Sequence, residues 1–157
     1  MTRGVVAVEL PGRGRVVLGA LLLDFTGTLS KDGALLPGVA KRIAALASRM
    51  RVVVLTADTC GTARAALAGL PVEVRLIATG ADKAKFVKSL RHEEVAAIGN
   101  GRNDVEMLRL AALGVAVVGP EGAAGALVRV ADVVVRDVRD AFDLLVHPLR
   151  LKATLRD

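Results

Sequence analysis

Short aliphatic runs alternate with helix-like segments along most of this chain, and this alternation limits the fold more than any other feature. Such a pattern predicts a parallel sheet whose strands are joined by helices. The expected strands are residues 21–25, 51–56, 73–77, 95–98, 115–118 and 133–135. The expected helices begin near Gly38, Gly61, Asp82, Asn103 and Gly122, and a last pair covers residues 138–155.

The expected strands are continuous runs of Val, Leu and Ile, which is typical of strands buried on both faces. We therefore expect helices on both sides of the sheet, in a Rossmann-like α/β three-layer sandwich. Residues 5–9 and 15–20 flank a Pro/Gly turn, which predicts an N-terminal β-hairpin. The segment 27–37 is too short for a large cap domain. A chain of 157 residues with 53% hydrophobic residues fits a single domain over residues 1–157.

Composition argues against several classes of protein. The apolar runs are far shorter than the roughly 18 to 20 residues that span a bilayer, so we expect no membrane helix. The first ten residues do not resemble a signal peptide, so we expect a cytoplasmic protein. The single cysteine, Cys60, cannot form an internal disulfide or a cysteine-based metal site.

The net charge of +6 suits an anionic partner, either nucleic acid or a small phosphorylated molecule. Single-strand binders usually stack bases on aromatic side chains, whereas this chain has no Trp or Tyr and only three Phe. We therefore expect no nucleic-acid partner.

Polar side chains follow three of the expected strands directly. They lie at residues 24–28, 56–58 and 99–104. In open α/β sheets the binding site lies beyond the carboxyl ends of the strands, where the connecting loops converge. These three clusters are therefore the candidate site.

Asp24 is the candidate nucleophile, because a carboxylate after an apolar strand, followed by Gly27 and Thr28, suits attack on phosphorus. An Asp that only caps a turn is the alternative. Thr56 at the end of the second strand can donate to a phosphoryl oxygen, and Lys83 near a helix start can neutralise charge on the transferred group. Taken singly, a threonine at a strand end is more often a turn residue, and a lysine near a helix start is more often a solvated one.

The loop 99–104 offers oxygen ligands of the kind that magnesium prefers. Asn100 and Asn103 are the only asparagines of a chain without glutamine, so their presence in one loop is notable. A tight Asn-Gly turn and a helix N-cap are the structural alternatives for these two residues.

Four segments resemble, in order, the four motifs of the haloacid dehalogenase superfamily. They are residues 24–29 (DFTGTL), 56–58 (TAD), 82–85 (DKAK) and 99–104 (GNGRND). Threonine two positions after the nucleophile and the TAD segment look specifically like the phosphorylation domain of P-type ATPases and its small relatives. The resemblance runs from about residue 21 to residue 118. It implies a hydrolase or phosphotransferase of small phosphorylated substrates.

The resemblance implies a role for each matching residue. Asp24 would form the aspartyl phosphate, with Thr56, Lys83 and Asp104 as further catalytic residues, and Lys85 is the alternative to Lys83. Phosphate would be bound by Gly27, Thr56, Ala57, Lys83 and Asn103. The cofactor would be Mg²⁺, with Asp24, the Thr26 carbonyl, Asn100 and Asp104 as its ligands, Asp104 through a water molecule.

Two positions depart from the family pattern. An acidic metal ligand is usual at the position of Asn100, and an amide there should weaken magnesium binding. Most phosphatases of the superfamily carry a general-acid Asp at the position of Thr26, whose hydroxyl cannot fill that role well. We therefore expect a preference for substrates with good leaving groups.

The leading hypothesis is a Mg²⁺-dependent phosphohydrolase or phosphotransferase with an open site, which a second copy of the chain in a homo-oligomer could cover. The alternative is a catalytically weak binding or regulatory module. A basic nucleic-acid-binding domain and a dehalogenase are less favoured hypotheses.

Overall fold

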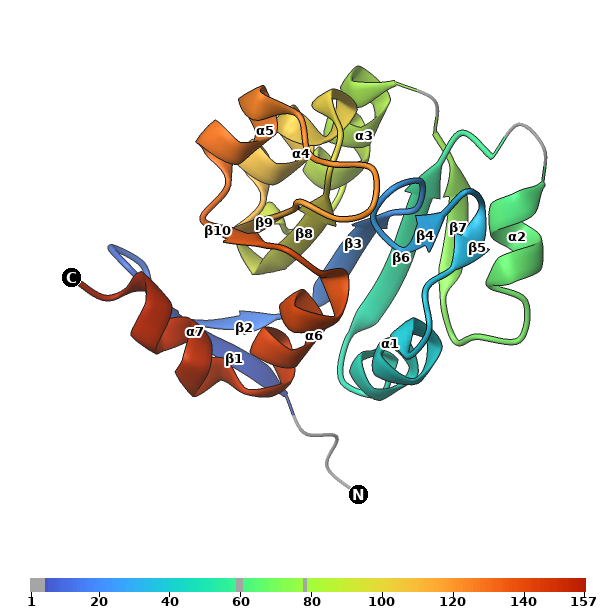
Figure 1. The fold of residues 1–157 in the computed structure, drawn as a ribbon. Coiled ribbons are helices and arrows are strands. Elements are labelled where there is room, and N and C mark those ends of the chain that lie inside the picture. The colour runs from blue at the N-terminus through green and yellow to red at the C-terminus, as the bar shows by residue number, and fades with distance from the viewer. Residues whose placement is uncertain (1–4, 59–60, 78) are drawn as a thin grey trace.

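The computed structural model describes residues 5–58, 61–77 and 79–157. A six-stranded parallel sheet forms its centre, with the strand order β10-β9-β8-β3-β6-β7 (Figure 1). The strands are β3 (Ala20–Asp24), β6 (Arg51–Thr56), β7 (Glu73–Leu76), β8 (Val95–Gly99), β9 (Leu113–Val117) and β10 (Val133–Val135). All six expected strands are present, with bounds that differ by at most two residues.

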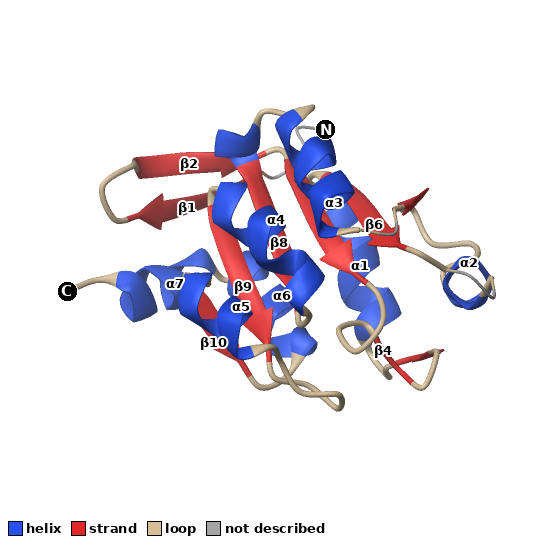
Figure 2. Ribbon diagram, turned by 90° about the horizontal axis from the view of Figure 1, so that it is seen from above, coloured by secondary structure: helices blue, strands red, loops and turns tan. Residues whose placement is uncertain are grey.

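Helices cover both faces of this sheet, which confirms the three-layer α/β fold. They are α1 (Val39–Ala47), α2 (Thr62–Ala66), α3 (Gly80–Lys88), α4 (Val105–Leu110), α5 (Gly125–Val130), α6 (Val138–Val146) and α7 (Pro148–Leu155). One hydrophobic core joins the sheet to α1 and α6, and a second joins its other face to α3, α4 and α5. Figure 2 shows α3, α4 and α5 over the same face of the strands.

Strand β3 shows why the sheet is buried on both sides. Successive side chains of a strand point to opposite faces. Leu21 and Leu23 pack in the core with α1 and α6, whereas Leu22 packs in the core of the other face. All three leucines are fully buried. A strand at this central position therefore requires an uninterrupted run of apolar residues, and not an alternation of polar and apolar ones.

The expected N-terminal hairpin is also present. Strand β1 (Val6–Leu10) pairs antiparallel with β2 (Gly14–Leu18) and is not part of the central sheet. Figures 1 and 2 show it beside α7, on the opposite side of the molecule from α2. Its buried residues Val6, Val8 and Leu18 join the same core as α6 and α7. The hairpin leads into the amino end of β3, far from that strand's carboxyl end.

A second hairpin was not expected from the sequence. Strands β4 (Ser30–Lys31) and β5 (Ala34–Leu35) pair antiparallel within the segment 27–37. Two residues a strand are too few to give a hydrophobic alternation, so the sequence carried no signal for them. No large cap interrupts this segment, as expected. Within the described part of the chain, no helix is long and apolar enough to span a membrane.

The sheet order places the three polar clusters side by side. Strand β3 lies between β8 and β6, and all three run parallel. The chain moves from β3 outward to β6 and β7, and then returns to the other side of β3 to build β8, β9 and β10. The carboxyl edge at such a reversal is where ligands bind in open α/β sheets.

Candidate functional site

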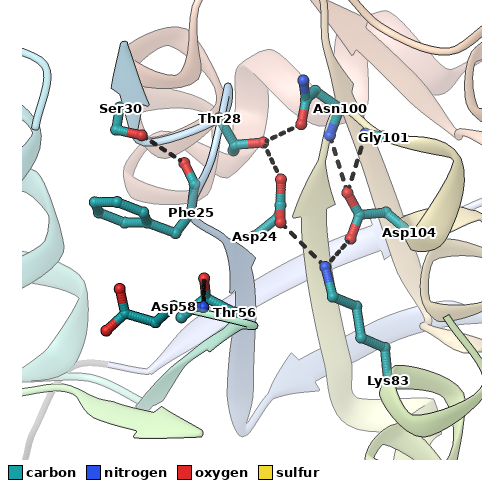
Figure 3. A network of polar contacts seen from close by, with 10 residues as sticks. All are labelled: Asp24, Phe25, Thr28, Ser30, Thr56, Asp58, Lys83, Asn100, Gly101 and Asp104. Atoms are coloured by element: carbon teal, nitrogen blue, oxygen red, sulfur yellow. Dashed lines mark hydrogen bonds and ion pairs between the residues drawn. The ribbon is translucent and has the colours of Figure 1, made fainter. Parts of the chain in front are cut away.

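Asp24 ends β3 and faces a cleft of about 500 Å³ at the carboxyl edge of the sheet (Figure 3). The cleft is lined by Asp24, Phe25, Thr26, Gly33, Thr56, Ala57, Asp58, Thr62, Lys83, Asn100, Gly101, Asn103 and Glu121. Loops after β3, β6, β8 and β9 contribute to it, together with α3, the start of α2 and the tip of the β4–β5 hairpin. Segments that are up to 97 residues apart in the sequence, from Asp24 to Glu121, thus meet in one depression.

Both oxygens of Asp24 are held by neighbours. Its Oδ1 accepts from Lys83 Nζ at 3.0 Å, and its Oδ2 accepts from the Thr28 hydroxyl at 3.0 Å. Burial and the nearby charge of Asp104 raise the pKa of Asp24 from 3.8 to about 6, although Lys83 and Thr28 act in the opposite direction. Asp24 is thus fixed in place while its charge is poorly solvated.

Lys83 reaches Asp24 from the first turns of α3. The Thr79 side chain caps this helix by accepting from the backbone N–H of Asp82, which fixes where the helix begins. Lys83 is only 1% exposed, and Asp104 Oδ1 lies 2.7 Å from its Nζ. Burial lowers the pKa of Lys83, but its two carboxylate partners outweigh burial and raise it overall. Lys85 is exposed to solvent, so the geometry favours Lys83 as the lysine of the site.

Asp104 lies behind Lys83 and is fully buried. Its Oδ2 accepts from the backbone N–H groups of Asn100 and Gly101, at 3.2 and 3.1 Å. A Cβ on Gly99 would lie 2.4 Å from this same oxygen, so only glycine fits there. Asp104 therefore stabilises the loop 99–104 through these two hydrogen bonds, and it orients Lys83.

Thr28 is a contact of Asp24 to which the sequence reasoning gave no role of its own. Its hydroxyl lies 3.0 Å from Asp24 Oδ2 and 3.2 Å from Asn100 Oδ1, and the residue is fully buried. A hydroxyl has one proton, so it can donate to only one of these oxygens at a time. Its place in the DFTGT segment was the only signal, and its contact with Asn100 spans 72 residues.

Asn100 connects the loop after β3 to the loop after β9. Its Nδ2 donates to the Gly122 carbonyl at 3.1 Å, which turns its Oδ1 toward Thr28. A Cβ on Gly27 would lie 2.5 Å from Asn100 Nδ2, and Gly27 has a φ of 76°. Glycine is thus required at this position for two reasons, the positive φ and the lack of space for a Cβ. Gly27 lies beside the cleft and is not one of its lining residues.

The remaining candidate residues also lie in the cleft. Thr56, Ala57 and Asn103 line it. Thr56 Oγ1 accepts from the backbone N–H of Asp58 at 3.2 Å, which is compatible with its proton being given to an oxygen in the cleft. The Asp58 carboxylate accepts from the backbone N–H groups of residues 63 and 64, at 2.7 and 3.1 Å, and so caps the start of α2.

The candidate metal ligands are oxygen atoms, which suit Mg²⁺, but few of them carry a negative charge. Asp24, Thr26 and Asn100 all line the cleft and carry oxygen atoms, and oxygen is the ligand atom that Mg²⁺ prefers. Among the described residues, no group of three His, Cys, Asp or Glu side chains could hold a metal ion. A magnesium ion here would depend on Asp24 for protein charge and on water for much of its coordination.

Glu121 lines the cleft and was given no role by the sequence reasoning. It lies in the loop after β9, and its side chain is exposed in the same cleft as Asp24 and Lys83. A turn residue between Pro120 and Gly122 has the appearance of an ordinary surface position. Only the approach of this loop to the β3 loop makes it part of the site.

Comparisons with known proteins agree with this architecture. Residues 58–140 match the sequence model of the haloacid dehalogenase-like hydrolases. An uncharacterized protein of Methanocaldococcus jannaschii is 46% identical over 79 residues, which are 48% of this chain and 85% of that protein.

Solved structures with low sequence identity share the fold. A 3-deoxy-D-manno-octulosonate 8-phosphate phosphatase of Moraxella catarrhalis, in complex with magnesium, phosphate and the sugar acid, superposes with a TM-score of 0.64 at 16% identity, over 88% of this chain and 94% of that one. The catalytic domain of the CPx-ATPase CopB-B superposes with a TM-score of 0.57 at 21% identity, over 71% of this chain and 44% of that one. Both the phosphatase fold and the P-type ATPase likeness are thus found again by structure.

Proposed function

Because this chain belongs to the haloacid dehalogenase-like hydrolases, we propose that it is a Mg²⁺-dependent phosphohydrolase or phosphotransferase that works through an aspartyl phosphate on Asp24. One observation carries the proposal. Asp24 faces the cleft at the carboxyl end of the central strand, with Lys83 Nζ 3.0 Å from its Oδ1. A fixed nucleophile beside a buried cation suits attack on a phosphoryl group.

In the first step an oxygen of Asp24 attacks phosphorus. A new O–P bond forms, the bond from phosphorus to the leaving group breaks, and the leaving group takes the electron pair. Lys83 stabilises negative charge on the phosphoryl oxygens, and Thr56 donates its hydroxyl proton to one of them. Asp104 holds Lys83 in place through the 2.7 Å contact. Mg²⁺, when held by Asp24, Thr26 and Asn100, would neutralise further charge on the phosphate.

The leaving group receives no proton from Thr26 in this proposal. Thr26 is exposed in the cleft, where the general acid of most superfamily phosphatases is expected, and its hydroxyl does not titrate near neutrality. We therefore propose that the protein favours substrates whose leaving groups need no proton, such as acyl phosphates and aryl phosphates.

The size and openness of the site support the proposed substrate class. A cleft of about 500 Å³ without a cap suits a small phosphorylated molecule. Several proteins of similar fold act on a phosphorylated sugar acid according to their names. We propose that the chain acts as a single domain in the cytoplasm, without nucleic acid or membrane as partner, and that a homo-oligomer could cover the site.

A panel of phosphate esters, tested with and without Mg²⁺, checks this proposal. Wild type should hydrolyse some of them only with the metal, and Asp24→Asn should abolish turnover while the circular dichroism spectrum stays unchanged. Acid quenching should recover covalent phosphate from wild type alone. Unchanged hydrolysis by a pure Asp24→Asn sample would refute the assignment.

A catalytically weak binding or regulatory module is the second candidate. It is favoured by the acid-poor donor set, since the described residues hold no cluster of three metal-binding acids or histidines. Such a module would bind inorganic phosphate, as measured by calorimetry, without any covalent phosphate on Asp24. The same acid-quench measurement thus separates the two candidates.

A further inference from the structure

We propose that Glu121 is the general base that activates water for hydrolysis of the aspartyl phosphate, an inference that rests on the proposed function. The proposed chemistry leaves this second step without a base. A group that removes a proton from water must lie in the cleft, be able to accept a proton, and have its polar atoms available to a ligand. Glu121 meets all three conditions.

The loop that carries Glu121 approaches the site closely. A Cβ on Gly27, the residue after Thr26, would lie 3.2 Å from the Cβ of Glu121. The backbone of Gly119 is equally close, since a Cβ on this residue would lie 3.3 Å from the Gly27 carbonyl oxygen. Figure 1 shows the loop after β9 beside the loop between β3 and β4. Glu121 therefore starts next to the position from which the usual acid of the superfamily would act.

The backbone of this loop is fixed on both sides of Glu121. Gly122 N donates to Gly119 O at 3.0 Å, which closes a turn over residues 119–122. Asn100 then binds the loop twice: its Nδ2 donates to Gly122 O at 3.1 Å, and its carbonyl accepts from Ala124 N at 2.8 Å. A rigid turn with an exposed side chain can present a carboxylate to the cleft without a large ordering cost.

The other ionisable groups in the cleft are engaged elsewhere. Among the described residues, Asp24, Asp58, Glu121 and Lys83 are the ionisable side chains that line it. Asp24 is the nucleophile, and Lys83 is held between two carboxylates. Both oxygens of Asp58 accept from the backbone at the start of α2. Glu121 is the acid in this set that has no such partner among the interactions of the described residues.

The proposed step is balanced as a hydrolysis. The water oxygen attacks phosphorus, and one of its protons passes to the Glu121 carboxylate. The bond between phosphorus and the Asp24 oxygen breaks, and its electron pair returns to the Asp24 carboxylate. Inorganic phosphate leaves, and Glu121 then releases its proton to solvent. No other reactant is needed.

Decay of labelled phosphoenzyme tests this role. The enzyme with bound Mg²⁺ is labelled with radioactive acetyl phosphate, chased with unlabelled acetyl phosphate, and sampled by acid quench. Glu121→Gln should form the phosphoenzyme within about twofold of the wild-type rate and lose it about 10²-fold more slowly, the lower range for general-base catalysis. Glu121→Asp should recover part of the decay rate. Hydroxylamine, which needs no base, should remove the label equally fast from wild type and Glu121→Gln.

Glu93→Gln is the matched control, because Glu93 is an exposed glutamate before the amino end of β8, at the opposite edge of the sheet. The phosphoenzyme of this control variant should decay at the wild-type rate. Equal decay in wild type and Glu121→Gln would overturn this inference alone. The inference would also be overturned if Glu121→Gln bound Mg²⁺ more weakly but its phosphoenzyme decayed at the wild-type rate when saturated with Mg²⁺. No covalent phosphate in any protein would overturn the proposed function as well.

Discussion

Lys83 Nζ lies 3.0 Å from Asp24 Oδ1, and both side chains are almost completely withdrawn from solvent, with exposed fractions of 1% and 7%. Buried charges are stable only when they are paired. Each residue therefore depends on the other for its ionised state as well as for its position.

Replacing Lys83 should be far more damaging than replacing Lys85. Lys83→Ala should raise the barrier for turnover by about 2 to 4 kcal/mol, the range for removing a preorganised charge from a transition state. Lys85→Ala is the matched control on the same helix, since Lys85 is exposed. Rates at saturating substrate for the two variants decide the matter. Similar losses in both, or a greater loss in Lys85→Ala, would contradict the geometric assignment.

The raised pKa of Asp24 makes the stability of the metal-free protein depend on pH. With a pKa of about 6 in the folded protein and 3.8 as its ordinary value, Asp24 holds a proton more tightly when folded. Its contribution to the free energy of unfolding is thus fully present below pH about 4 and is lost as the pH rises through 6. At about 1.4 kcal/mol per pH unit, the loss approaches about 3 kcal/mol.

Asp24→Asn removes this dependence. In EDTA, the variant and wild type should have similar unfolding free energies near pH 4, and the variant should become the more stable protein as the pH rises to 8. Urea denaturation at several pH values measures the difference. Asp32→Asn, in the exposed turn of the β4–β5 hairpin, controls for the loss of one carboxylate. A difference that stays constant between pH 4 and 8 would show that burial does not perturb Asp24.

Asn100→Asp should strengthen magnesium binding while weakening the metal-free protein. The new carboxylate supplies a negative ligand. The substitution also removes the amide N–H that donates to the Gly122 carbonyl. A carboxylate oxygen, which is an acceptor, then faces this carbonyl, at a cost of about 1 to 3 kcal/mol in stability. Thermal unfolding should therefore show a lower midpoint without metal and a larger increase on adding Mg²⁺. If the midpoint falls and Mg²⁺ does not restore it, residue 100 does not face the metal.

Thr26→Asp should change the preference for leaving groups. General acid catalysis typically contributes about 10² to 10⁴-fold, so wild type should favour nitrophenyl phosphate over alkyl phosphates by roughly that margin. The variant should gain more on alkyl esters than on nitrophenyl phosphate, since Thr26 is exposed in the cleft and a carboxyl group fits there. The measurement is the rate against leaving-group pKa for both proteins. A flat dependence in wild type would mean that another residue already protonates the leaving group.

The amino-acid sequence by itself determined the α/β fold and the main members of the candidate site. Strands and helices are encoded locally, by apolar runs and by turn residues such as the glycine at position 61, so all six central strands and the helices that join them were predicted. The proximity of the polar clusters could also be predicted, because parallel strands bring their carboxyl ends to one edge of the sheet. Thus Asp24, Thr56 and Asn100 were expected together, and they line one cleft.

The tertiary structure alone decided which side chains complete the site. The sequence favoured Lys83 and left Lys85 as the alternative, and the packing of α3 on the sheet buries the first and exposes the second. Thr28 meets Asn100 across 72 residues, and Glu121 enters the cleft because its loop packs on Gly27. Such contacts depend on the distance between segments in space, which no local pattern of residues encodes.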